Sequence, residues 1–276
     1  MKVKNRIPSL IACALATLLF ASVALASSTT VIVTGDDVGT SWFTADTRTG
    51  GAVNFVVGPS TPPLGVGSLE MTTTDANGAG QAKAQLFTYD YIGTPLDTID
   101  AISYATYRRS SSTNSLAQTI SLNIEVDYTG AGSFTTLVFE PVYNPAQGPM
   151  LLDTWQEWDA FSGGTAVWWS TKDIPGVCAF NCFVPWSVIV AANPDAEILG
   201  GFGFNVGSGW AGVYSGAADK LTFGVSGTSV IYDFEPYRVA QTEDDCKNGG
   251  WQHVRRADGS SFKNQGDCMQ YVKTGK

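Results

Sequence analysis

The stretch Ser121 to Pro141 reads SLNIEVDYTGAGSFTTLVFEP, and it decides the fold. Apolar and polar residues alternate along both halves, with Gly130-Ala131 between them, a pattern typical of two antiparallel strands joined by a two-residue turn. That turn sets a register in which the facing pairs are Tyr128 with Ser133, Ile124 with Leu137, and Leu122 with Phe139. One face of the hairpin is therefore apolar. The other carries Asn123, Glu125, Asp127, Thr136 and Glu140 and is expected to be wet.

Similar short runs, rich in β-branched and aromatic residues and separated by Gly, Pro, Asn and Asp, fill the chain from Thr30 to about Tyr237. They are VIVTG, AVNFVVG, GSLEMTTT, AKAQLFTY, AISYATYR, TISLNIEVDY, FTTLVFEPVY, AVWWS, GGFGFNVG, KLTFGV and SVIYDFEP. Only Pro185–Ala196 favours a helix, ended by Asn193-Pro194. Many strands without helical crossovers predict an all-β fold, an antiparallel β-sandwich of jelly-roll or concanavalin-like type, over residues 27–240.

Residues 1–26 have the features of a secretory signal peptide. Lys2, Lys4 and Arg6 precede an apolar run from Leu10 to Leu25, and small residues at positions 24 and 26 favour cleavage after Ala26. A lipoprotein reading at Cys13 is the alternative, but it leaves almost no apolar segment before the cysteine. No later segment reaches the ~20 apolar residues of a membrane span. We therefore expect a secreted, extracellular protein.

The charge balance excludes several partners. Loss of the three basic residues of the signal moves the net charge from −9 to −12. An acidic chain without a basic cluster repels phosphate backbones and anionic lipid surfaces, so neither nucleic acid nor membrane is an expected partner.

The cysteines fit an oxidising compartment. Beyond Cys13, four remain: Cys178, Cys182, Cys246 and Cys268. An even set in an exported chain indicates disulfides, and of three connectivities the local one, 178 with 182 and 246 with 268, is the simplest. Zinc is the alternative, but paired CxxC spacing is missing.

Residues 241–276 differ in composition from the rest and are bracketed by two cysteines, which predicts a small disulfide-closed C-terminal appendage. CKNGGW (Cys246–Trp251) followed by FKNQGDC (Phe262–Cys268) resembles a tail motif of exported bacterial proteins of unassigned function. The body, with PPLGVGSLEM (Pro62–Met71), TLVFEPVY, WQEWDAF, WWS and YDFEP, is similar to secreted bacterial proteins expected to form concanavalin-like or jelly-roll sandwiches. The resemblance implies no established activity.

The sequence lacks the residues that most common catalytic sites require. His253 is the only histidine, so triads based on histidine and catalytic zinc are disfavoured, and no phosphate loop of the type GxxxxGK[ST] is present. Carboxylate chemistry needs only two acids. Glu125 and Asp127 lie on one face of a strand, roughly 6.6 to 6.8 Å apart along the backbone, near the lower end of the spacing of inverting glycosidases. A glycoside hydrolase is therefore one alternative function, although solvated strand charges are the simpler reading of the pair and acids that bind a ligand are another.

Calcium is the only cofactor with any support, as a structural ion. Asp36 and Asp37 after the first strand and Asp233 and Glu235 in the last come together if the two strands pair, and hard oxygen ligands suit calcium. No contiguous D-x-D-x-D-G loop occurs, and ordinary loop acids are the simpler reading.

The tryptophans suggest a ligand. The stretch Trp155–Ser170 holds four of the eight, and a turn at Gly163-Gly164 pairs Trp158 with Trp169 toward a core. Neighbours in a strand point to opposite faces, so this register places Trp168 outside. The predicted ligand-binding residues are Trp155, Glu157, Asp159, Trp168 and, in a glycine-rich loop, Trp210.

A flat ring beside carboxylates suits a pyranose, whose C–H face covers the ring while its hydroxyls meet the acids. We therefore expect a non-catalytic carbohydrate-binding protein whose partner is an extracellular glycan or cell-wall or matrix component. Structural packing of the rings is the alternative to stacking. A structural surface protein is the third candidate function.

Overall fold

The computed structural model describes residues 27–74 and 80–276, so the expected signal peptide at residues 1–26 lies outside the described residues. The strands are β1 (Ser27–Val33), β2 (Trp42–Phe43), β3 (Gly51–Val57), β4 (Gly67–Thr73), β5 (Lys83–Thr88), β6 (Ile99–Arg108), β7 (Ser121–Asp127), β8 (Thr135–Phe139), β9 (Trp155–Asp159), β10 (Val167–Ser170), β11 (Val184–Pro185), β12 (Glu197–Gly207), β13 (Tyr214–Val225), β14 (Thr228–Phe234), β15 (Arg238–Val239) and β16 (Val254–Arg255). The α-helices are α1 (Trp186–Ala192), α2 (Glu243–Cys246) and α3 (Gln265–Thr274).

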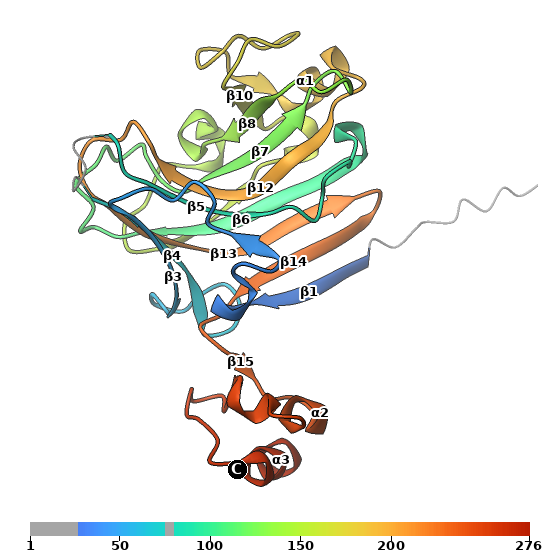
Figure 1. The fold of residues 1–276 in the computed structure, drawn as a ribbon. Helices are drawn as coiled ribbons and strands as arrows, with labels where there is room; N and C mark the ends of the chain where they lie inside the picture. The colour runs from blue at the N-terminus through green and yellow to red at the C-terminus, as the bar shows by residue number, and fades with distance from the viewer. Residues whose placement is uncertain (1–26, 75–79) are drawn as a thin grey trace, which may run out of the picture.

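Two seven-stranded sheets face each other, as the all-β sandwich prediction requires (Figure 1). The first sheet has the order β1-β14-β13-β4-β3, with β6 beside β13 and β9 beside β6. The second has the order β11-β10-β8-β7-β12-β5-β2 and is antiparallel throughout. In the first sheet β1 pairs with β14 in parallel, which confirms that the first and last strands of the sandwich meet.

The hairpin formed by β7 and β8 confirms the register read from the sequence. Ile124 pairs with Leu137 and Leu122 with Phe139, so the apolar residues of both strands point inward. All eleven β-rich runs contain strand, and α1 occupies the predicted helical segment and ends at Asn193. Regular alternation over several residues fixes which side of a strand is buried, and here both strands of the pair carry it.

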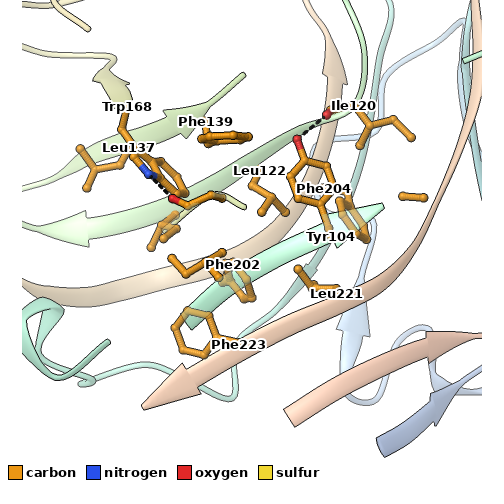
Figure 2. Packing of buried hydrophobic residues seen from close by; sticks show 14 of the residues in the cluster. Tyr104, Ile120, Leu122, Leu137, Phe139, Trp168, Phe202, Phe204, Leu221 and Phe223 are labelled. Carbon is orange, nitrogen blue, oxygen red and sulfur yellow. Dashed lines mark hydrogen bonds between the residues drawn. The ribbon is translucent and has the colours of Figure 1, made fainter. Parts of the chain in front are cut away.

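A core rich in aromatic residues fills the space between the sheets. Figure 2 shows Phe139 and Trp168 of the second sheet close to Tyr104 of the first. The ring centroids of Tyr104 and Phe139 are 6.1 Å apart, and those of Phe139 and Trp168 are 5.5 Å apart. Buried polar atoms of these rings are satisfied, because the Tyr104 hydroxyl donates to the carbonyl of Ile120.

The predicted tryptophan hairpin is wrong. Strand β9 belongs to the first sheet, where Trp158 pairs with Tyr104 of β6, and β10 belongs to the second, where Trp169 pairs with Val138 of β8. The segment around Gly163-Gly164 forms a 3-10 turn that carries the chain from one sheet to the other. Strands on opposite sheets both turn their inner residues toward the same core, so Trp158 and Trp168 are both buried.

The C-terminal appendage has a hydrophobic cluster of its own, separate from the sandwich core. The cluster contains Ala240, Cys246, Val254, Phe262 and Cys268. Strand β15 leads out of the sandwich and pairs with β16 of the appendage (Figure 1), while Arg238 in the same strand forms an ion pair with Asp37 of the sandwich at 2.7 Å. Helices α2 and α3, which the sequence did not predict, are joined by the disulfide between Cys246 and Cys268.

The second disulfide joins Cys178 to Cys182, so both local pairs are confirmed and the zinc reading of the cysteines is wrong. Over residues 27–74 and 80–276, none of the helices combines the length and apolar character that a bilayer crossing requires.

Candidate functional site

The outer face of the second sheet gathers polar side chains in its middle. On β12, Asn205 pairs with Gln85 of β5 on one side and with Ser121 of β7 on the other. Two residues further along β7, Asn123 pairs with Val138 of β8. Residues two apart share a face, so this face is lined with amides and hydroxyls while the opposite face packs on the core.

This face is hollowed by a cleft of about 230 Å³. Its lining includes polar side chains of β5, β7 and β12, Glu140 directly after β8, and three aromatic rings. The rings are Trp169, which follows the buried Trp168 on β10, Phe180 in the Cys178–Cys182 loop, and Trp210 in the loop after β12. We call this hollow the outer-sheet cleft.

The aromatic wall at one end of the cleft is fixed by the backbone. The amide of Phe180 donates to the carbonyl of Ser170 at 2.9 Å, and the five-residue disulfide loop holds the ring beside Trp169 with centroids 5.6 Å apart. The ring of Phe180 is 59% exposed and that of Trp169 is half-buried. Trp210 is also half-buried and packs edge-on against Tyr214 at 5.5 Å. The rings are thus supported from behind and open in front.

A buried hydrogen-bond acceptor lies in the cleft. Asn205 is only 7% exposed; its Nδ2 donates to the carbonyl of Gly207 at 2.7 Å, and its Oδ1 has no protein partner. A buried acceptor without a partner costs free energy unless water or a ligand supplies a donor. Asn205 thus lines the cleft with an amide whose oxygen is covered by the surrounding protein and has no partner among the described residues.

Glu140 supplies the negative charge of the cleft. Its Oε2 accepts a hydrogen bond from Nε1 of Trp169 at 2.9 Å, and none of the ion pairs among the described residues includes it. Burial raises the pKa of the Glu140 carboxyl above its usual value, and the Trp169 hydrogen bond opposes that shift. The carboxylate is thus partly desolvated and without a counter-charge from the protein.

Lys83 lies at the far end, on β5 opposite Gly207 of β12. Its Nζ is 2.6 Å from Oδ2 of Asp46, and hydrogen bonding to Arg48, with a further contribution from Lys83, lowers the pKa of Asp46 to about 2. Asp46 therefore stays ionised and is shared between Arg48 and Lys83, which holds the lysine ammonium on the Asp46 side of the cleft.

Of the five predicted ligand-binding residues, only Trp210 lines the cleft. The prediction for Trp168 is wrong: its indole is completely buried, and its Nε1 donates to the carbonyl of Ala160 at 2.8 Å (Figure 2). The alternation that placed one neighbouring indole outside holds, but the outer ring is Trp169, because β10 pairs with β8 and not with β9.

The remaining three predicted residues lie on the outer face of β9, in the other sheet. Trp155 is half-buried, packs against Tyr107 at 5.6 Å and donates its Nε1 to the carbonyl of Pro59 at 2.9 Å. Glu157 pairs with Lys220 at 2.7 Å, and Asp159 accepts from the amides of the turn that follows it. The polar atoms of these three residues are already bonded to other protein groups. The residues lie on the first sheet and the cleft on the second, so they are not part of the outer-sheet cleft.

The two carboxylates of β7, Glu125 and Asp127, accept hydrogen bonds from different parts of the protein. Asp127 accepts hydrogen bonds from the Thr129, Gly132 and Ser133 amides and organises the turn of the hairpin, and hydrogen bonding, first from the Ser133 hydroxyl, holds its pKa well below the usual range. Glu125 is partly exposed and accepts from the Gly201 amide at 2.7 Å. A general acid needs a raised pKa, so Asp127 is unsuited to that role in glycoside hydrolysis.

The four calcium candidates do not form one cluster. Asp37 pairs with Arg238 at 2.7 Å, and Asp36 is exposed. Asp233 and Glu235 are buried, and Glu235 accepts from the amides of Val66 and Gly67. Within residues 27–74 and 80–276, no group of three or more His, Cys, Asp or Glu side chains is arranged to hold a metal ion.

Sequence reasoning missed Trp169, Phe180, Asn123, Asn205 and Glu140 as members of one site. The alternation in SLNIEVDY did place Asn123 and Glu140 on a wet face, which was the available signal. What it lacked was the order of the strands, since the β7–β8 hairpin, β10 and β12 come from three separated segments.

Comparisons with family models, with curated proteins and with solved structures found no match to this chain. The resemblance of the tail and body to exported bacterial proteins stays a prediction, and the candidate site is argued from its own geometry.

Proposed function

We propose that this protein is secreted and binds an extracellular carbohydrate, without turnover, in the outer-sheet cleft. One observation carries the proposal: Trp169 and Trp210 line the same hollow as the polar side chains of Asn123, Asn205 and Glu140. A pyranose presents an apolar C–H face to a ring and hydroxyls to its edges, so it needs both kinds of group within one site.

A second hollow supports carbohydrate less well. It has a volume of about 280 Å³ and is walled mainly by Leu116, Val142, Met150 and several prolines. Hydroxyls transferred there from water would lose hydrogen bonds without replacement. The polar outer-sheet cleft is therefore the better match to a sugar.

The test is a glycan array followed by calorimetric titration of the best binder. The variants are Trp169→Ala and Trp210→Ala, with Trp155→Ala as the matched control, because Trp155 is also a half-buried indole on an outer strand face but lies in the other sheet. We expect each cleft variant to weaken binding about tenfold or more, corresponding to about 1.4 kcal/mol per ring, and the control to bind like the wild type.

Absence of binding to every glycan, or equal binding by the wild type and both cleft variants, contradicts the proposal and favours a structural surface protein. Release of reducing sugars from a polysaccharide, abolished by Glu125→Gln, favours a glycosidase instead. Melting curves of the variants separate loss of binding from loss of fold.

A further inference from the structure

We propose that the sugar bound in the outer-sheet cleft carries an ammonium group, held between the Glu140 carboxylate and the rings of Trp169 and Phe180. This inference rests on the proposed function and names its ligand class: a glycan containing amino sugars with free amines rather than a neutral or acidic glycan.

The first support is an unbalanced charge. Glu140 accepts a hydrogen bond from Nε1 of Trp169 at Oε2, and among residues 27–74 and 80–276 no hydrogen bond or ion pair reaches its other oxygen. Burial dominates the upward shift of the Tyr104 and Tyr143 pKa values, and the charge of Glu140 adds to both, so its field reaches the surrounding phenols. A desolvated carboxylate without a counter-charge is stabilised when a ligand brings a cation.

The second support is the aromatic wall beside it. Trp169 and Phe180 are 5.6 Å apart with their planes tilted by 41°, and both line the cleft together with Glu140. A cation over the face of an aromatic ring, within about 6 Å of its centre, gains roughly 0.5 to 2 kcal/mol. The rings and the carboxylate both stabilise an ammonium group. A neutral hydroxyl group gains much less binding free energy from either of them.

The cleft has a negative end at Glu140 and a positive end at Lys83. Glu140 follows β8 and Lys83 begins β5, and in the sheet β7 and β12 lie between these strands. Three strand spacings amount to about 14 Å, beyond the screening length of about 8 to 10 Å at ordinary salt, so the lysine, held by Asp46, opposes a cation at the Glu140 end only weakly. Asn205 lies between the two ends, where the neutral part of the same sugar chain would pass.

The test titrates three hexasaccharides into the full chain at about pH 6: glucosamine hexamer, N-acetylglucosamine hexamer and cellohexaose. Amines of this kind titrate near roughly 8, so the glucosamine amines are charged. We expect glucosamine hexamer to bind about tenfold more tightly than the two neutral chains, with a preference that weakens as salt is raised.

The decisive variant is Glu140→Gln, which keeps an acceptor for Trp169 and removes the charge. It should abolish the preference for glucosamine hexamer and change affinity for cellohexaose less than threefold. Glu125→Gln is the matched control, because Glu125 is a partly exposed carboxylate on the same sheet face that does not line the cleft, and it should retain the preference.

Equal or weaker binding of glucosamine hexamer by the wild type, or a preference that survives Glu140→Gln, overturns the inference. If the neutral chains still bind and Trp169→Ala weakens them, the proposed function stands without it. If the wild type binds no hexasaccharide in the titrations and no glycan on the array, the inference and the proposed function are both wrong.

Discussion

Trp168 and Trp169 are consecutive residues with opposite environments: the first is completely buried and hydrogen-bonded to Ala160, and the second is half-buried in the outer-sheet cleft and hydrogen-bonded to Glu140. Strand geometry alone requires their side chains to diverge. The pair therefore links the core to the candidate site through one peptide bond.

The two indoles should differ in their effect on stability. Trp168→Ala leaves a cavity among Phe139 and Trp186 and is expected to lower the free energy of unfolding by about 3 to 5 kcal/mol. Trp169→Ala removes a half-exposed ring and should cost less than about 1.5 kcal/mol. Urea denaturation measures both, and equal losses would contradict the assignment of Trp168 to the core.

Stability should fall as pH rises from about 4 to 7. Burial, with the charge of Asp233 adding to it, raises the pKa of Asp219 to about 7; burial and the charge of Glu235 raise that of Asp233 to about 6. Over this window the unfolded chain has lost protons that the folded protein still binds, so each rise in pH favours unfolding.

Asp233→Asn tests this reading because an amide does not titrate. The difference in stability between variant and wild type should be smallest near about pH 3, where most of the carboxyl is protonated in both states, and the variant should be the more stable of the two at pH 8. Thermal melts across the range provide the measurement, and Asp36→Asn, at an exposed carboxylate, is the control expected to leave the profile unchanged.

Asp127 should show the opposite dependence on pH. Its pKa is lowered in the fold by hydrogen bonds from the turn, so the stability it contributes is present above pH 4 and disappears as pH falls toward its folded pKa. Asp127→Asn loses acceptors for these donors and should be less stable than the wild type at pH 7. The gap should narrow on acidification; a gap that widens in acid would refute this account.

The disulfide of the appendage should stabilise the tail alone. Replacing Cys246 and Cys268 with alanine opens a loop with a sequence separation of 22 and is expected to cost about 3 kcal/mol. Because the tail cluster is separate from the sandwich core, hydrogen exchange should accelerate in residues 241–276 and stay unchanged in β7 and β12. Faster exchange throughout both would show that the two parts unfold together.

The fold could be predicted where two strands with alternating apolar and polar residues pair with each other and lie close in the sequence. The β7–β8 hairpin has alternation on both strands and a short glycine-containing connection, so its register followed directly. The tryptophan segment has the same appearance, but β9 is taken up by β6 and β10 by β8, strands that precede both of them by many residues. Short strands of this kind carry too little pattern to select one partner among many.

The candidate site was harder for the same reason. Asn205 and Trp169 are ordinary outward-facing residues on β12 and β10, and only the order of strands in the second sheet brings them to one cleft. The bridge between Cys178 and Cys182 was predicted, but Phe180 joins the cleft because its amide bonds to the carbonyl of Ser170, a contact that the sequence does not indicate. Helix α3 was missed because the polar tail was read as held by its disulfide alone.

Because side chains alternate between the two faces of β10, inserting or deleting one residue in this strand reverses which residues face the core. Deleting a single codon within β10 before Trp168 would turn the inner indole toward solvent and its neighbour toward the interior, which exchanges the residue that lines the cleft with the residue that fills the core. Length variation in this part of the gene is consequently barred even where substitution is permitted, and a library that randomises the cleft should vary side chains while keeping the number of residues constant.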